Sequence, residues 1–274
     1  MAALRVRATT TRRSATVDDI VFRGPDGLDV EAYLVRPAHA AHATGDVGTG
    51  PGPGLLMWHW LDSEAPDGNR SQYLDEAAEL AGAGVVSLLP QGRFPWVDAP
   101  DNAADDMVAV TAEVARLRAG LDLLAARSDV DPARLGIVGH DFGGMLATVA
   151  AAEERRLRAL VIVAATPRWG DWFLPFWQIA DDRLDYLRAM RPLDPIERIG
   201  AAASASVLFQ FAERDFYIAP MSAREFVRAA PDGAELRMYD TGHSMRLPVI
   251  TADRRAFLAR TLIGPPAGQP TAAG

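Results

Sequence analysis

The sequence predicts an α/β domain built on a mostly parallel central sheet with helices on both faces. Short, continuous apolar runs alternate along the chain with segments whose apolar residues recur at helical spacing. Strands of a parallel sheet are covered on both faces, so continuous apolar runs that alternate with helices are typical of such a sheet. A chain of 274 residues, 49% of them hydrophobic, is long enough for one domain of this kind with a substantial core.

The N-terminal region is expected to hold a flexible tail and a hairpin. Residues 1–16 carry four arginines among threonines and alanines and read as a loose tail. From residue 17 to residue 37, apolar and polar residues alternate on both sides of Pro25-Asp26-Gly27, which predicts a β-hairpin with its turn there. The domain is expected to extend over residues 17–263, and the Pro- and Gly-rich residues 264–274 to form a second flexible tail.

Strands and helices alternate over the rest of the chain. A loop rich in proline and aromatic residues, 91–101, precedes the longest predicted helix. Buried strands are predicted at residues 55–60, 85–89, 135–140, 160–164, 206–211 and 235–239. Helices are predicted at residues 73–83, 103–127, 145–152, 220–229 and 251–262.

The composition argues against several kinds of site and partner. There is no cysteine, which rules out disulfides, a thiolate metal site and a cysteine nucleophile. The five histidines lack metal-ligand spacing, so we expect neither a metal nor another cofactor. The net charge is −8 and the arginines form no basic stripe, which argues against nucleic acid. Without a signal-peptide core or a bilayer-spanning stretch, we expect a cytoplasmic protein with no membrane partner. A small, largely apolar molecule is the expected substrate, and a homodimer is one option for its assembly.

The most informative motif lies at residues 135–144, where an apolar run breaks into a turn framed by glycines and leads into an Ala-rich segment. Gly139 and Gly143 stand two places before and two places after Asp141. They leave room for a strained turn that lifts one side chain above the end of a strand, while the next helix aims its free amides at the same point. Asp141 is the side chain that this turn presents.

The segment Gly139-His140-Asp141-Phe142-Gly143 is similar to the nucleophile elbow of the α/β hydrolases, with aspartate where an esterase or peptidase carries serine. The elbow resembles that of epoxide hydrolases and some dehalogenases. The long helix at 103–127, the Asp-Pro turn after it and the short strand resemble instead the dienelactone-hydrolase and prolyl-oligopeptidase branches. The nucleophile in those branches is cysteine or serine, so the scaffold and the elbow point to different chemistries.

The resemblance also implies the partners of Asp141. His243 follows a glycine beyond the last predicted strand, where the family carries its catalytic base, and Asp215 leaves the preceding strand as the family's acid does, with Glu213 as the alternative. The order nucleophile, acid, histidine is that of the α/β hydrolases. The family's oxyanion hole implies backbone amide donors at Phe142 and Leu61. Trp60 stands where the family has a glycine, and we expect His59 to pack in its loop.

Residues 166–200 form an insert rich in aromatic side chains, and superfamily members often place a lid here. We interpret it as a short lid over the pocket, and an aromatic cluster that only closes the core is the alternative. The residues predicted to line the pocket are Trp60, Phe94, Trp96, Trp169, Trp172, Phe176, Trp177, Tyr186 and Tyr217.

Aspartate at the elbow changes the electrophile that the site suits. A carboxylate is a poor nucleophile toward esters, but it can displace a leaving group at a saturated carbon. An epoxide or a carbon–halogen bond is such an electrophile, and the product is an Asp141 ester that water activated by His243 cleaves. The dehalogenases hold halide with a donor just after the nucleophile, whereas Phe142 has none, and Tyr186 or Tyr217 is a candidate acid for epoxide opening. The resemblance therefore favours an epoxide over a carbon–halogen bond as the substrate.

Two other hypotheses remain open at this stage. In the first, Asp141 is a general base or a binding group, and the protein is a cyclase, lyase or isomerase on a hydrolase scaffold. In the second, loss of the serine has left a binding protein without catalytic activity. The fold alone does not separate them, because function depends on the site.

Overall fold

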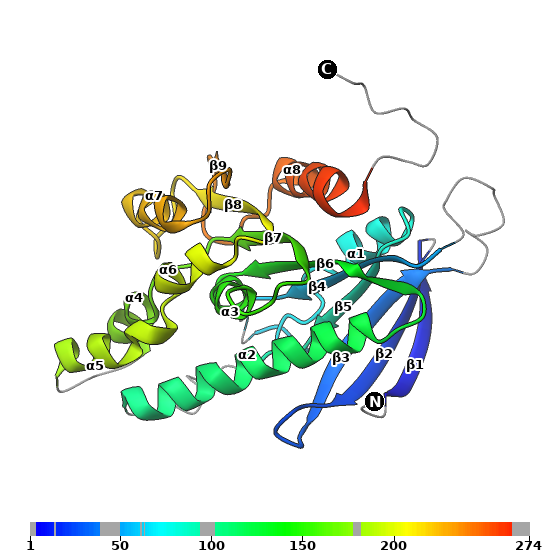
Figure 1. Ribbon diagram of the computed structural model, residues 1–274, viewed down its shortest axis with the longest axis horizontal. Coiled ribbons are helices and arrows are strands. Elements are labelled where there is room, and N and C mark those ends of the chain that lie inside the picture. The colour runs from blue at the N-terminus through cyan, green and yellow to red at the C-terminus, as the bar shows by residue number, and fades with distance from the viewer. Residues whose placement is uncertain are drawn as a thin grey trace.

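A nine-stranded sheet runs through the molecule (Figure 1), in the order β1-β2-β3-β5-β4-β6-β7-β8-β9. The computed structural model describes residues 4–13, 15–38, 50–60, 62, 64–93, 102–177 and 182–264. The strands are β1 Arg5–Arg12, β2 Ala15–Arg23, β3 Asp29–Pro37, β4 Gly52–Trp58, β5 Val86–Pro90, β6 Val130–His140, β7 Leu157–Val163, β8 Ser206–Ala212 and β9 Glu235–Tyr239. Neighbours from β5 to β9 in this order run parallel, and β1, β2 and β3 pair antiparallel with their neighbours.

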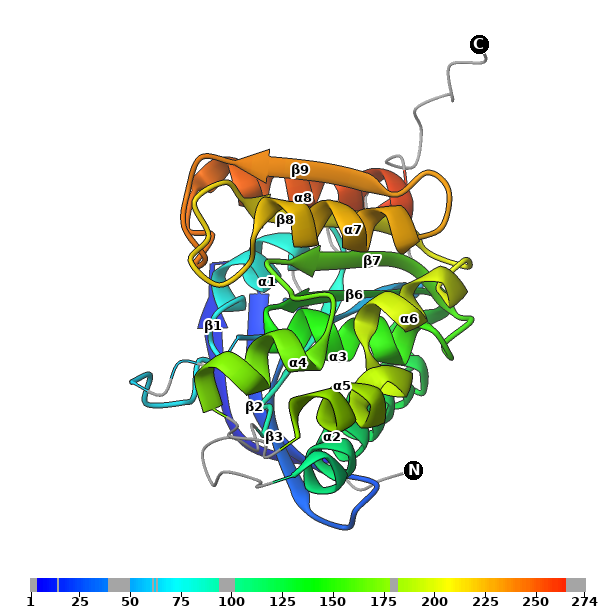
Figure 2. The same ribbon diagram turned by 90° about the vertical axis from the view of Figure 1, so that its left-hand side faces the viewer.

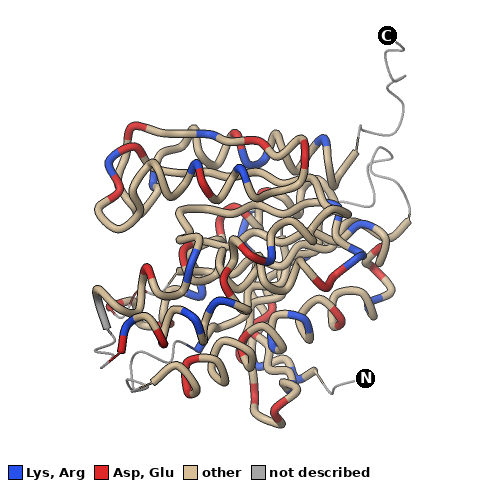
Figure 3. Tube along the Cα trace, turned by 60° about the vertical axis from the view of Figure 1, so that its left-hand side comes forward, with Lys and Arg blue, Asp and Glu red and all other residues tan. Residues whose placement is uncertain are grey.

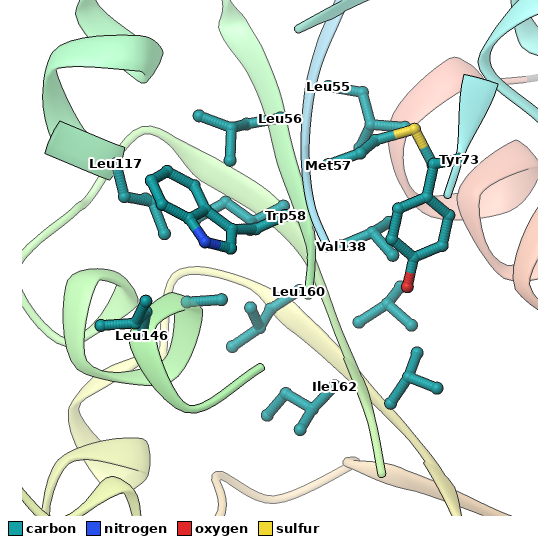
Figure 4. Close-up of a cluster of buried hydrophobic side chains, with 14 of the residues drawn as sticks. Leu55, Leu56, Met57, Trp58, Tyr73, Leu117, Val138, Leu146, Leu160 and Ile162 are labelled. Carbon is teal, nitrogen blue, oxygen red and sulfur yellow. The ribbon is translucent and has the colours of Figure 1, made fainter. Parts of the chain in front are cut away.

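The parallel strands form the core, as their continuous apolar runs predict. Leu55 and Leu56 of β4 and Ile137 and Val138 of β6 are fully buried. Figure 4 shows Leu117 and Leu146 beside Trp58 on one side of the strands, and Tyr73 on the other side. Both faces are therefore covered, which explains why these strands show no polar alternation.

Helices cover both faces of the sheet (Figure 2). On one face lie α2 Ala103–Ala125, α3 Phe142–Ala151 and α7 Pro220–Ala229, and on the other lie α1 Leu74–Ala81 and α8 Pro248–Leu258, which continues as η6 Ala259–Ile263. Every strand and helix that the sequence predicts is present, α7 and β9 with the predicted bounds and the others with shifted bounds, and α3 begins directly after Asp141. Within the described ranges, no helix is both long and apolar enough to cross a membrane.

A buried ion pair joins the two helices of the second face. Arg254 of α8 donates from Nε and Nη2 to the carboxylate of Glu76 in α1, at 2.9 and 2.6 Å. Its Nη1 donates to Oε1 of Gln210 in β8, at 2.8 Å. Removal of one partner would leave the other charge buried and unpaired, which is strongly unfavourable. The pair therefore holds α8 against α1, and α8 directly follows the loop that carries His243.

The prediction of a loose N-terminal tail is wrong, because Arg5–Arg12 forms strand β1. This strand pairs with β2 from Arg5↔Val21 to Arg12↔Ala15, and every one of its residues is exposed. Ion pairs hold it as well as the backbone ladder, for example Arg12 with Asp75 at 2.7 Å. Acidic and basic residues are interspersed in this way along much of the described chain (Figure 3). An edge strand that buries no side chain leaves no hydrophobic signal. The C-terminal tail predicted at 264–274 lies outside the described residues from 265 on.

The hairpin prediction is confirmed, and the insert is helical. Strands β2 and β3 pair throughout their length, with Gly27 at φ 75° in the turn. The described part of the insert consists of the short helix α4 Trp169–Trp172, the π-helical turn η3 Phe173–Trp177, the helices α5 Arg183–Met190 and α6 Pro195–Arg198, and the 3₁₀ turns η4 Arg191–Leu193 and η5 Ile199–Ala201. Helix α5 packs on α2 and α6 on α3, so the insert adds a helical layer over one face of the sheet, next to the site.

Candidate active site

Asp141 occupies a sharp turn between β6 and α3. Its φ of 53° and ψ of −118° lie outside the regions that non-glycine residues favour, a strain of about 1–3 kcal/mol that is typical of functional sites. A Cβ on Gly139 would lie 2.2 Å from the carbonyl oxygen of Gly143, and one on Gly143 would lie 2.5 Å from that of Trp58. Both glycines are therefore required by close backbone approach, and the turn is the elbow that the sequence motif predicts.

His243 lies between two carboxylates. Its Nδ1–H donates to Asp215, with Oδ2 at 2.9 Å and Oδ1 at 3.1 Å, and the amides of Tyr217 and Ile218 donate to Oδ1 at 2.9 and 3.1 Å. On the other side of the ring, Nε2 faces Oδ1 of Asp141 at 3.8 Å. These last two atoms are buried and have no hydrogen-bond partner among the described residues. The three residues predicted to be catalytic thus lie together.

Burial and charge shift the pKa of both facing groups. Burial raises the pKa of the Asp141 carboxyl above its usual range, although His243 opposes this. Burial lowers the pKa of His243, but Asp141 and Asp215 outweigh it and raise that pKa to about 9. With a pKa of about 9, His243 is protonated near neutral pH, and its imidazolium faces the buried carboxyl group of Asp141.

Three of the predicted pocket residues surround His243 with aromatic rings. The ring centroids of Trp60, Trp172 and Tyr217 lie 5.9, 5.8 and 4.9 Å from that of His243. Tyr217 also packs on Trp172, with centroids 4.8 Å apart. An aromatic surround of this kind excludes water from the imidazole and favours apolar parts of a ligand.

Two other predicted pocket residues point elsewhere, and their assignment is corrected. Trp169 is buried, stacks on Phe142 and donates from its indole nitrogen to the Leu193 carbonyl at 2.7 Å. Tyr186 is buried, and its hydroxyl donates to the Asp106 carboxylate of α2. Both rings pack the insert onto the rest of the domain, because they lie on the faces of the insert helices that turn toward it. Tyr186 is therefore not our candidate acid.

The remaining predicted pocket and oxyanion residues are described only in part. Leu61, Phe94 and Trp96 lie outside the described residues, as do the side chains of Phe176 and Trp177. The amide of Phe142 is one of the groups that lower the pKa of the Asp141 carboxyl against the effect of burial. Its place at the start of α3 is that of the predicted oxyanion donor.

The loop at Trp60 is fixed by polar contacts of its own. The Trp60 amide donates to Oε1 of Gln72 at 3.0 Å, so this amide already has a partner. His59 donates from Nδ1 to the Trp60 carbonyl at 2.8 Å, and its Nε2 accepts from the Gly92 amide at 3.0 Å. Burial lowers the pKa of His59 to about 4. His59 is therefore a neutral packing residue, as expected from the sequence.

Sequence reasoning missed His140 and Gln72. His140 Nε2 lies 3.1 Å from the His243 carbonyl oxygen, and its Nδ1 lies 2.7 Å from Gln72 Nε2. Both residues are close to the triad without facing Asp141. The position of His140 directly before Asp141 in the elbow could have indicated a role for it. Nothing in the sequence around Gln72 indicates one.

A cleft of about 390 Å³ lies beside this group, between the insert and the loop that leads from β8 to α7. Its lining is mixed, with Asp171 and Arg183 as well as Leu174 and Leu187. Tyr217 forms part of its wall and also contacts His243. The Tyr217 ring therefore separates the cleft from the imidazole of His243.

Comparisons with known proteins agree with this geometry. The model of the prolyl oligopeptidase family matches residues 110–254, which is more than half of the chain and includes Asp141, Asp215 and His243. A comparison with curated protein sequences finds no significant match.

Solved structures resemble the whole chain at low sequence identity. An acetyl xylan esterase from Paenibacillus sp. R4 has a TM-score of 0.70 at 18% identity, covering 94% of this chain and 87% of that one. An S-formylglutathione hydrolase from Agrobacterium tumefaciens has a TM-score of 0.65 at 17% identity, covering 94% and 99%. A prolyl endopeptidase has a TM-score of 0.66 at 20% identity, and the match covers 91% of this chain but only 39% of that one. These likenesses establish an α/β-hydrolase fold.

Proposed function

Since this chain belongs to the prolyl oligopeptidase family of α/β hydrolases, we propose that it is a hydrolase in which the Asp141 carboxylate replaces the serine nucleophile. The substrate class that we propose is an epoxide, opened by attack at a saturated carbon. The reaction passes through an alkyl ester of Asp141, which water then hydrolyses.

The observation that supports this proposal most directly is the position of His243 between two carboxylates. Asp215 holds Nδ1 at 2.9 Å, which leaves Nε2 toward Asp141 at 3.8 Å. In a serine hydrolase the atom facing Nε2 is the nucleophile, and the elbow gives Asp141 that position. Burial also removes solvating water from the carboxylate, so less hydration has to be lost before attack.

The first step needs a nucleophile and an acid. Asp141 attacks one epoxide carbon, a carbon–oxygen bond forms, and the strained ring bond breaks. The developing alkoxide takes the Nε2 proton of the His243 imidazolium, which the raised pKa of about 9 keeps in place at neutral pH. The Tyr186 hydroxyl is bonded to Asp106 and is not the acid, and Tyr217, the other tyrosine considered, packs its ring against His243, with centroids 4.9 Å apart. We assign the acid to His243, which carries its proton at the nitrogen that faces Asp141.

The second step needs a base, and the first step creates it. Ester formation neutralises Asp141, one of the two carboxylates that raise the pKa of His243, so that pKa falls. Neutral His243 then takes a proton from water, the hydroxide attacks the ester carbonyl, and the diol leaves with that proton. Asp141 is released as a carboxylic acid and returns its proton to His243, so the cycle adds water and leaves no net charge.

An epoxide fits this site better than a carbon–halogen bond. Ring opening produces an alkoxide, whose main requirement is a proton, and His243 carries one at the facing nitrogen. Halide needs hydrogen-bond donors that stay in place, and the side chain of Phe142, next to the nucleophile, has none. Alkyl halides are therefore the second substrate class.

General-base catalysis by Asp141 is the second candidate function. Its specific support is the unpartnered, buried Oδ1, whose carboxyl has a raised pKa and therefore a greater affinity for a proton. In that case the protein removes a proton from its substrate, as a cyclase, lyase or isomerase does, and no ester forms on Asp141.

A single turnover in heavy-oxygen water should distinguish these functions. With the protein in excess over an aryl epoxide such as styrene oxide, hydrolysis of the ester should place one solvent oxygen in the Asp141 carboxylate. Mass spectrometry of the tryptic peptide that begins at Leu135 detects it, and Asp141→Asn treated in the same way is the control. Turnover without label at Asp141 would exclude the nucleophile and favour the general base. A folded protein that turns over neither epoxides nor alkyl halides would contradict the proposed substrate classes.

The rate of ester formation should fall as the pH rises through about 9. His243 donates a proton in this step, and it is protonated below its pKa of about 9, so the acid is present at neutral pH and lost above that value. Rapid-quench measurements from about pH 6 to about pH 10 should show a plateau and then a decrease of about tenfold per pH unit. A rate of ester formation that stays constant across pH 9 would show that His243 is not the acid.

A further inference from the structure

A chain of hydrogen bonds runs from the Trp60 loop to the backbone of the catalytic histidine. The Trp60 amide donates to Gln72 Oε1 at 3.0 Å, and Gln72 Nε2 contacts His140 Nδ1 at 2.7 Å. His140 Nε2 contacts the His243 carbonyl oxygen at 3.1 Å. Three segments that are distant in the sequence therefore meet at one buried imidazole, that of His140.

The two ends of this chain fix the direction of every bond in it. A backbone amide only donates, so Gln72 Oε1 must accept from Trp60, which turns Nε2 of the same side chain toward His140. The amide nitrogen only donates, so Nδ1 of His140 must be unprotonated. The carbonyl of His243 only accepts, so Nε2 of His140 must carry the proton. His140 is thus a neutral imidazole in a single tautomer.

The surroundings of His140 keep it in this state. Its side chain is buried, and the Trp60 ring stacks on it with centroids 5.5 Å apart and planes at 16°. Burial, and then the nearby charge of His243, lower the pKa of His140 well below its usual value. The ring centroids of the two histidines are 5.8 Å apart, so a charge on His140 would repel the His243 imidazolium.

We propose that Gln72 and His140 are positioning residues, which hold the backbone of His243 so that its Nε2 stays directed at Asp141. The Asp215 contact fixes one ring atom of His243, but a ring can pivot about a single contact. The bond from His140 to the His243 carbonyl fixes the backbone of the same residue, so the two contacts together determine where Nε2 points. Because His140 directly precedes Asp141, the same turn carries the proposed nucleophile and the residue that positions His243.

This chain of hydrogen bonds from Trp60 through Gln72 and His140 to His243 is called the relay. Its role in the reaction rests on the proposed function, but the directions of its hydrogen bonds do not, so different measurements test the two.

Nuclear magnetic resonance of the histidine rings tests the directions without any substrate. In protein labelled with ¹⁵N at histidine, His140 should show the neutral Nε2–H tautomer from about pH 6 to about pH 9. Gln72→Glu keeps the shape but places an acceptor opposite Nδ1, so His140 should gain a proton there and its ring nitrogen shifts should move to those of an imidazolium. A His140 that titrates near its ordinary pKa in the parent protein, or carries its proton on Nδ1, would overturn the relay.

Single-turnover kinetics test the positioning role. Gln72→Leu should slow hydrolysis of the Asp141 ester on the order of 10-fold to 100-fold, because His243 must be accurately placed to take the proton of the water that attacks the ester. Ester formation should change less, because the strained ring drives it. Gln91→Leu is the matched control, since Gln91 also bonds a loop carbonyl, that of Gly92 at 3.0 Å, and lies outside the relay.

The outcomes separate the two levels of inference. Equal rates in Gln72→Leu and the parent, or an equal loss in Gln91→Leu, would overturn the positioning role. Gln72→Asn, whose amide is one methylene shorter, should recover little activity if position matters and much of it if only polarity matters. If no ester forms in the parent protein, the proposed function fails, while the ring spectra still decide whether the relay exists.

Discussion

A His243→Gln variant is expected to accumulate the Asp141 ester and to lose steady-state turnover by about 10²-fold to 10⁴-fold. Hydrolysis of the ester needs a base at the position of Nε2, and glutamine supplies none. Ring opening survives better, because ring strain drives it and the glutamine amide can still donate a hydrogen bond to the alkoxide. Intact-protein mass spectrometry should therefore show an added mass equal to that of the epoxide, and peptide mapping should place it on Asp141.

Two aspartate variants serve as comparators for this experiment. Asp215→Asn keeps the base but removes the carboxylate that orients Nδ1 at 2.9 Å, so turnover should fall and less ester should accumulate than in His243→Gln. Asp240→Asn is the control, because Asp240 is exposed and pairs only with Arg214 among the described residues. Turnover by His243→Gln at the parental rate would rule out His243 as the base, and added mass at another residue would rule out Asp141 as the nucleophile.

The elbow could be predicted from the sequence because local constraints produce it, whereas Asp215 and His243 were proposed as its partners from a family resemblance. At Gly139 and Gly143 an added Cβ would lie only 2.2 and 2.5 Å from a backbone carbonyl oxygen, which leaves no space for a side chain. Such positions can be recognised without knowledge of the rest of the fold. The parallel strands were predictable for a similar reason, since a strand buried on both faces must be apolar along its length.

The parts that were missed depend on contacts that no local pattern records. Strand β1 is exposed at every residue, so pairing with β2 and ion pairs such as that of Arg12 with Asp75 keep it in the sheet without an apolar pattern. The aromatic residues of the insert were predicted as one group, but Trp172 reaches His243 while Trp169 and Tyr186 pack away from it. Which face of a short helix turns inward is decided by its neighbours.

The relay around His140 could not be predicted from the sequence for a further reason. Gln72 and His140 are 68 residues apart, and His140 and His243 are 103 apart. A glutamine in a turn and a histidine at the end of a strand have no distinctive spacing. Only the folded chain shows that these side chains meet and that each hydrogen bond between them can run in one direction only.

Charge is the main difference between this site and that of a serine hydrolase. A serine at the elbow leaves the histidine beside one carboxylate, whereas here Asp141 and Asp215 together raise the pKa of His243 to about 9. The resting histidine is therefore an acid, which suits epoxide opening and opposes the base-first chemistry of an esterase. Removing the charge of Asp141 should reverse this preference.

Asp141→Ser is accordingly expected to exchange one activity for the other. Epoxide turnover should be lost, since no carboxylate remains at position 141 to attack. Weak hydrolysis of small activated esters should appear, with Ser at position 141, His243 and Asp215 acting as a triad. With only Asp215 left beside it, His243 should have a lower pKa and be neutral near pH 7, as a general base must be. The Phe142 amide, at the start of α3, is the expected oxyanion donor, and one such donor is worth about 3 kcal/mol. Ester hydrolysis is measured against Asp141→Asn, which removes the same charge but provides no hydroxyl and should hydrolyse neither esters nor epoxides. If Asp141→Ser folds but shows no esterase activity above Asp141→Asn and no labelling by a serine-directed phosphonate, the turn does not present residue 141 for attack, and the nucleophile role of Asp141 fails with it.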